Sequence, residues 1–126
     1  MSTTVVLYIE DNPDNMLLVE RLLIARGCQM VKAINGSTGI ELALEHTPHI
    51  ILLDINLPDI DGYEVARRLR DNPLTATIPI VAVTANALKG DAEKALAAGC
   101  DGYVSKPINL RDLWNAMLQF IQAPST

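Results

Sequence analysis

The strongest constraint on the fold of this chain is a regular alternation of short apolar runs with segments of helical periodicity. Five apolar runs begin near Val5, Met30, Ile50, Ile80 and Tyr103. After each run, apolar residues recur at three- and four-residue spacings, which is typical of amphipathic helices. Strict alternation of this kind predicts a parallel sheet with right-handed crossovers and helices on both faces. The sequence therefore predicts an α/β three-layer sandwich.

Short polar residues mark the predicted helix starts, because their side chains can accept hydrogen bonds from the first free N–H groups. Ser37 or Thr38 is the predicted N-cap of the second helix, Asp61 of the third and Asn109 of the last. The fourth helix is predicted over about residues 88–98, because this stretch is rich in alanine and ends before a glycine.

The bulk properties indicate one soluble domain over residues 1–126. The formal net charge of -5 argues against direct DNA binding, which needs clustered basic residues. Cys28 and Cys100 lack a CxxC spacing, as expected of two thiols in a reducing compartment. The apolar run over residues 5–9 is too short for a signal peptide or a membrane span. We therefore expect a cytoplasmic protein with no membrane contact.

Polar side chains follow four of the five predicted strands. Glu10 and Asp11 follow the first strand and Asp54 ends the third. Thr84 ends the fourth strand and Lys106 follows the fifth. In open parallel sheets, ligands bind outside the carboxyl ends of the strands. We therefore expect three carboxylates, one hydroxyl and one ammonium to converge at a single edge.

The three carboxylates favour a divalent cation. Close carboxylates cannot all stay ionised without a counter-charge, and Mg²⁺ (or Mn²⁺) prefers carboxylate, carbonyl and water oxygens. Asp11 and Asp54 are the predicted direct ligands, and Glu10 is predicted to act through a metal-bound water. The backbone carbonyl of Asn56 is predicted to complete the protein ligands. Alternatively, Glu10 and Asp11 simply cap the first helix.

Asp54 is the candidate acceptor of a phosphoryl group. A carboxylate beside a cation is suited to in-line attack on phosphorus, which gives an acyl phosphate. Lys106 can pair with Asp54 before transfer and with a phosphoryl oxygen afterwards. Thr84 can donate a hydrogen bond to another phosphoryl oxygen. Each residue also has a purely structural reading: a turn aspartate, a surface lysine and a β-branched strand residue.

Two further features lie around Lys106. Tyr103, three residues earlier, is either a half-exposed packing residue or a side chain that changes rotamer with the state of the site. The Lys106–Pro107 pair fits a tight turn in which a cis peptide bond would aim the lysine inward. The sequence leaves the isomer open.

At these positions the chain resembles the receiver domains of bacterial response regulators. The resemblance spans nearly the whole chain in the family's order, and the ordered set is more specific than any single motif. The matching segments are Glu10-Asp11-Asn12, Leu52-Leu53-Asp54-Ile55-Asn56-Leu57-Pro58, Asp61-Gly62, Val83-Thr84-Ala85, Gly99-Cys100-Asp101-Gly102-Tyr103 and Ser105-Lys106-Pro107.

The resemblance implies a flavodoxin-like (βα)5 fold with strand order 2-1-3-4-5. It implies that Asp54 is the phosphoacceptor and that Glu10 and Asp11 form an acidic metal pocket. It also implies that Thr84 and Lys106 stabilise the phosphorylated state and that Thr84 acts with Tyr103 as a switch. Such a chain catalyses only its own phosphoryl transfer and dephosphorylation.

The same resemblance implies the partners. The phosphoryl donor would be a sensor histidine kinase or a histidine phosphotransfer protein, and the output surface would be the fourth helix, fifth strand and fifth helix, roughly residues 88–121. Because no DNA-binding module is visible, the signal is expected to leave through protein contacts with a target that the sequence does not identify. Met1 just ahead of the first strand favours a stand-alone receiver, although a receiver excised from a hybrid kinase would look the same.

Other functions agree less well with the residues. An aspartate-dependent phosphatase of the haloacid dehalogenase type needs a second Asp two residues after the first, where this chain has Asn56. A flavin mononucleotide carrier needs a phosphate-binding loop after the first strand, where Glu10 and Asp11 would repel the phosphate. An interaction module that is never phosphorylated is a further alternative, although every candidate residue for metal binding and phosphoryl transfer is present.

Overall fold

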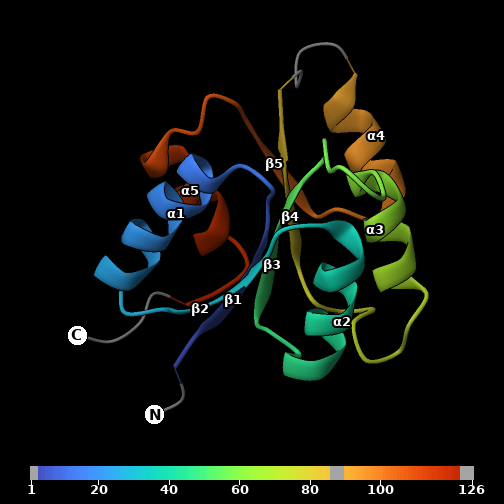
Figure 1. The fold of residues 1–126 in the computed structure, drawn as a ribbon, viewed down its shortest axis with the longest axis horizontal. Coiled ribbons are helices and arrows are strands. Elements are labelled where there is room, and N and C mark those ends of the chain that lie inside the picture. The colour runs from blue at the N-terminus through green and yellow to red at the C-terminus, as the bar shows by residue number, and fades with distance from the viewer. Residues whose placement is uncertain (1–2, 86–89, 123–126) are drawn as a thin grey trace.

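The computed structural model describes residues 3–85 and 90–122, which form five parallel strands and five helices in strict alternation. The strand order is 2-1-3-4-5, so the predicted fold class and strand order are confirmed. Helices α1 and α5 cover one face of the sheet and α2, α3 and α4 cover the other (Figure 1). The strands are β1 (Val5–Ile9), β2 (Gln29–Ala33), β3 (Ile50–Asp54), β4 (Ile80–Thr84) and β5 (Gly102–Ser105), and the helices are α1 (Pro13–Ala25), α2 (Gly36–His46), α3 (Gly62–Arg70), α4 (Asp91–Ala98) and α5 (Leu110–Leu118).

The central strands are apolar on both faces because helices cover each side of the sheet. Every residue of β3 and of β4 is buried. Along β1, alternate side chains face opposite layers. Leu7 and Ile9 join the core under α2, α3 and α4, whereas Val6 and Tyr8 join the core under α1 and α5. Among the described helices, none is long and apolar enough to cross a membrane.

The helix caps agree with the sequence prediction in two of three cases. The side chains of Asp61 and Asn109 each accept a hydrogen bond from the amide three residues on, as predicted. The prediction for α2 is wrong: the cap is Asn35, whose Oδ1 accepts from the amide of Thr38 at 2.8 Å. The helix starts directly after this asparagine, so Ser37 already lies in its first turn. Helix α4 is described from Asp91, and the predicted residues before position 90 lie outside the described part.

The guanidinium of Arg70, the last residue of α3, joins the loops at the amino edge of the sheet. Its Nε donates to the carbonyl of Gly99 at 2.8 Å, and Nη1 donates to the carbonyl of Ile78 at 2.6 Å. Its Nη2 pairs with Asp101 Oδ2 at 2.6 Å, and the same oxygen accepts from the amide of Ile80. Arg70 therefore fixes the starts of β4 and β5 relative to α3.

We expect Arg70→Ala to lower the free energy of unfolding by about 3 kcal/mol, because several charge-assisted hydrogen bonds to half-buried carbonyls are lost at once. Urea denaturation measures the change. Arg68→Ala is the matched control on the same helix, since Arg68 pairs with Glu64 on the exposed surface and such pairs contribute little. An Arg70 variant as stable as the Arg68 variant would contradict the assignment.

Candidate functional site

Three carboxylates meet at the carboxyl edge of the sheet. One oxygen from each of Glu10, Asp11 and Asp54 lies within 4.8 Å of the others. Glu10 and Asp54 are each 1% exposed, while Asp11 is exposed and gives the cluster an opening to solvent. The parallel strands thus bring together the carboxylates that the sequence placed at this edge.

A lysine enters the same cluster. Lys106 Nζ lies 2.9 Å from Asp54 Oδ1, and the amide of Asn56 donates to the same oxygen at 3.1 Å. The backbone amide of Lys106 donates to the carbonyl of Thr84 at 2.8 Å, which holds the two neighbouring strand ends together. The Lys106–Pro107 peptide bond is cis. Among the described residues, the site therefore holds three carboxylates and one ammonium, and Asp54 contacts both kinds of charge.

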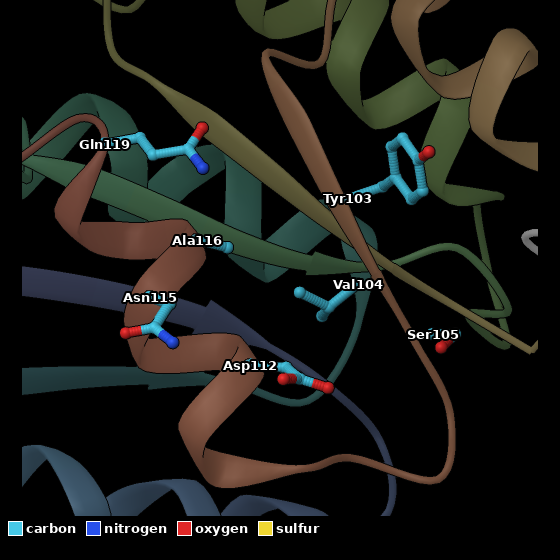
Figure 2. A pocket seen from close by; sticks show the side chains of 7 residues that line it. All are labelled: Tyr103, Val104, Ser105, Asp112, Asn115, Ala116 and Gln119. Carbon is cyan, nitrogen blue, oxygen red and sulfur yellow. The ribbon is translucent and has the colours of Figure 1, made fainter.

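Thr84 lies beside this cluster, and Tyr103 is on the neighbouring strand β5, where it pairs with Ala82. Thr84 is fully buried, and its Oγ1 donates a hydrogen bond to Asp91 Oδ2, in the first turn of α4, at 2.9 Å. Tyr103 is 45% exposed and extends from β5 away from α5 (Figure 2). Residues of β5 and α5 line a groove of about 320 Å³, and none of the three carboxylates is part of its lining (Figure 2). In this conformation the tyrosine ring is outside the core.

The first helix is capped by a residue other than the two acids. Asn12 is the N-cap of α1, and its side chain accepts from the amides of Asp14 and Asn15. The alternative in which Glu10 and Asp11 serve as the cap is therefore wrong. Glu10 instead accepts hydrogen bonds from Tyr8 and Asn15. Burial and the neighbouring Asp54 raise the pKa of the Glu10 carboxyl above its ordinary value.

The donor set fits a small divalent cation. Two of the three carboxylates are withdrawn from water, and Lys106 compensates a single negative charge. Mg²⁺ is held by one or two carboxylates together with carbonyl oxygens and waters, and the exposed side of Asp11 leaves room for those waters. The cluster could therefore hold a metal ion.

The loop after β3 is held to the rest of the structure at both ends. The amide of Gly62 donates to the carbonyl of Ile55 at 2.8 Å, and a Cβ on Gly62 would come within 2.6 Å of Ile55 Cα. At the loop's tip, the Asp59 carboxylate accepts from the amides of Gly36 and Ser37 and from the Ser37 hydroxyl, at 2.8 to 3.0 Å. The Asp61-Gly62 motif and Asp59 together fix the segment that carries Asn56.

Sequence reasoning missed Asp59, Tyr8 and Asn15. The contact of Asp59 joins residues more than 20 positions apart, so no local pattern reveals it. The sequence does contain a signal for Tyr8. Residues two apart on a strand point to the same face, and Glu10 follows Tyr8 by two, so the two side chains are predicted to lie close together.

Fold and site define the class of this protein. A parallel sheet in the order 2-1-3-4-5 with its polar site at the carboxyl edge is the flavodoxin-like arrangement of chemotaxis-type receivers. A sequence profile of the family described as "Response regulator receiver domain" matches residues 6–118. The chain belongs to this family, and it is a phosphorylation-dependent signalling domain of two-component systems.

Individual relatives support the assignment to the receiver-domain family. The chain is 44% identical over 105 residues to the polar-differentiation response regulator DivK of Brucella anthropi, covering 83% of this chain and 85% of the relative. The structure is similar to the receiver domain of the sensor histidine kinase PA1611 from Pseudomonas aeruginosa PAO1, with a TM-score of 0.87 and 33% sequence identity. The match covers 94% of this chain and 98% of that chain, and the PA1611 structure has a magnesium ion coordinated in its active-site cleft. A further match is the co-crystal structure of the Saccharomyces cerevisiae histidine phosphotransfer protein Ypd1 with the receiver domain of Ssk1, with a TM-score of 0.84 and 30% sequence identity. This match covers 95% of this chain and 93% of that chain.

Asp59 gives a pH-dependent prediction. Hydrogen bonds from the backbone amides of Ser37 and Gly36 hold the pKa of the Asp59 carboxyl well below its usual range. The ionised carboxylate therefore stabilises the fold above its unfolded pKa of about 3.9, and this contribution is lost as the pH falls through the lowered folded value. We expect Asp59→Ala to lower the midpoint of thermal unfolding at pH 7, with a difference from the wild type that narrows below pH ~4.

Asn35→Ala is the control for this measurement. Asn35 caps the same helix with a side chain that does not titrate, so its loss should lower the midpoint by the same amount at every pH. An Asp59 variant whose deficit stays constant down to the lowest pH studied would show that the charge of the carboxylate is not what matters.

Proposed function

We propose that Asp54 accepts a phosphoryl group from a phosphohistidine of a sensor kinase or a histidine phosphotransfer protein. A carboxylate oxygen of Asp54 attacks phosphorus, the phosphorus–nitrogen bond breaks, and the imidazole nitrogen keeps the electron pair and takes up a proton. The observation that carries the proposal is the position of Asp54: it is buried, paired with Lys106, and within 4.8 Å of two further carboxylates.

A divalent metal belongs to the proposal. Asp11, Asp54 and the backbone carbonyl of Asn56 would hold Mg²⁺ or Mn²⁺ directly, and Glu10 would do so through a water molecule. The ion would neutralise charge on the phosphoryl oxygens when bound. The short separation of the three carboxylate oxygens and the magnesium ion in the related receiver from Pseudomonas aeruginosa support this part.

Lys106 and Thr84 would stabilise the phosphorylated form. Lys106 already lies 2.9 Å from Asp54 Oδ1, so a small movement of its ammonium would let it pair with a phosphoryl oxygen. Thr84 would donate its hydroxyl to another oxygen, and this exchange would release Asp91 at the start of α4. Tyr103, exposed in the present conformation, would then turn inward.

The proposed partners follow from the same chemistry. Receiver domains interact with histidine kinases or phosphotransfer proteins, as the match to the Ypd1–Ssk1 structure illustrates. For this chain we propose a donor of that kind and an output surface made by α4, β5 and α5. Signalling would proceed by protein contacts without direct DNA binding, and the only reaction catalysed would be the domain's own phosphoryl transfer and loss.

Asp54→Asn is expected to abolish phosphorylation, because an amide is a poor nucleophile towards phosphorus. Incubation with a small phosphodonor and Mg²⁺ should add one phosphoryl group to the wild-type protein and none to the variant, as read by mass spectrometry of the intact chain. Asp71→Asn is the control, since Asp71 caps the far end of α3 and should be labelled as the wild type is. Labelling that survives in the Asp54 variant, with its circular dichroism unchanged, would move the acceptor elsewhere.

Asp91→Ala tests the proposed switch. In this variant the hydrogen bond from the Thr84 hydroxyl to Asp91 no longer has to break before the hydroxyl donates to the phosphoryl group. A hydrogen bond to a charged acceptor changes an equilibrium constant by roughly tenfold. We expect the variant to bind beryllofluoride, which mimics the phosphoryl group, about 3- to 10-fold more tightly.

Glu93→Ala is the control for the Asp91 variant. It removes another acid from the first turn of α4, and thus a similar interaction with the helix dipole, without touching Thr84. Equal beryllofluoride affinities in the two variants would assign the effect to charge at the helix and contradict the role of the Thr84–Asp91 bond.

A further inference from the structure

A buried tyrosine hydroxyl reaches the carboxylate cluster from inside the core. Tyr8 is fully buried in β1 and packs in the apolar layer under α1 and α5. Its hydroxyl donates to Glu10 Oε1 at 2.9 Å. A phenylalanine would fill the same apolar space, so the hydroxyl is the part of this side chain that serves the site rather than the core.

A second donor converges on the same oxygen. Asn15 Nδ2, from the first turn of α1, donates to Glu10 Oε1 at 3.1 Å. The other oxygen, Oε2, receives a long contact of 3.4 Å from the amide of Asn12, near the limit for a hydrogen bond. The two oxygens of Glu10 are therefore unequal: a strand and a helix hold Oε1 firmly, and Oε2 keeps most of its capacity to accept.

We propose that Tyr8 and Asn15 are positioning residues that hold Glu10 so that it presents Oε2 alone to the cation. The inference rests on the metal site of the proposed function and adds two residues to it. Neither residue would touch the metal. Each would act through Glu10, by fixing its rotamer with a hydrogen bond to Oε1.

This arrangement favours one class of cation. Mg²⁺ demands a near-octahedral shell at short distances and keeps several waters, so a carboxylate that offers one oxygen, directly or through a water, fits it well. Ca²⁺ takes more ligands and readily uses both oxygens of one carboxylate. With Oε1 held by two donors, Glu10 is a poor bidentate ligand. Tyr8 and Asn15 therefore contribute to selectivity for Mg²⁺ over Ca²⁺.

The test compares matched tyrosine variants. Tyr8→Phe removes the hydroxyl that holds Glu10. Tyr63→Phe removes a hydroxyl that is buried without a hydrogen-bond partner in the described part of the chain. Asn15→Ala removes the second donor from the rim of the site, which keeps the test informative if Tyr8→Phe folds poorly. Isothermal titration of each unphosphorylated protein with Mg²⁺ and, separately, with Ca²⁺ gives the affinities, and thermal unfolding without metal gives the stability.

We expect Tyr8→Phe and Asn15→Ala to bind Mg²⁺ about 10-fold more weakly, the lower end of the effect seen when residues that orient a metal ligand are removed. Ca²⁺ affinity should fall less, so the ratio of the two affinities falls, whereas Tyr63→Phe should match the wild type. Mg²⁺ affinity within twofold of the wild type in both variants would overturn the proposal. So would equal losses for both cations that accompany a lowered unfolding midpoint, because a purely structural role would act that way.

The outcome is separable from that of the proposed function. Metal titration of the unphosphorylated protein does not require Asp54 to be the acceptor, whereas labelling of Asp54→Asn does not depend on Tyr8. If the wild-type protein binds Mg²⁺ and the Asp54→Asn variant is still labelled, Asp54 is not the acceptor. The titrations of the Tyr8 and Asn15 variants would still confirm or contradict the positioning role.

Discussion

The structure depends on keeping three carboxylates together at one edge of a sheet. Like charges at this separation disfavour the folded state unless hydrogen bonds and a counter-charge compensate them. Here Lys106 and the Asn56 amide donate to Asp54, and Tyr8 donates to Glu10. Among the described residues of the cluster, one ammonium against three carboxylates leaves a negative charge, which is why the cluster suits a divalent cation and why compensation comes from groups on several elements.

Strand-end chemistry was predictable because it is local in sequence. A parallel sheet puts the residues after each strand at one edge whatever the details of packing. The apolar runs alone therefore predict that Glu10, Asp54 and Lys106 lie together, as they do in the structure. The alternation of runs likewise predicted the layers. The roles of all the site residues remain predictions, because they concern a phosphorylated state and a bound cation. These residues are Asp54, Lys106, Thr84 and Tyr103, together with the candidate metal ligands Glu10, Asp11 and Asn56.

What sequence reasoning could not find were contacts made across the fold. Arg70 meets carbonyls and a carboxylate from segments up to 31 residues away, and Asp59 meets an amide 23 residues away. Neither contact leaves a periodic trace in the chain. The error at α2 had a different origin. Asn35, Ser37 and Thr38 are all capping residue types, so the sequence offered more than one start for this helix. Asn35 is the cap because its backbone is extended, and the following glycine lets α2 pack closely on Ile60 and Val65.

The connections of the site to the outer helices are unequal, and this bears on how a phosphoryl group could change the surface. Asp59 joins the loop after β3 to α2 by accepting hydrogen bonds from backbone amides of Gly36 and Ser37. Phosphorylation of Asp54 would not draw these amides away from Asp59. The Thr84 hydroxyl, in contrast, is bonded to Asp91, and the carbonyl of Thr84 accepts from Lys106, which itself holds Asp54. A new oxyanion on Asp54 would compete for both donors at once. The change would therefore reach α4 and the neighbouring β5 before it reaches α2, which is the physical reason for placing the output on that side of the sheet.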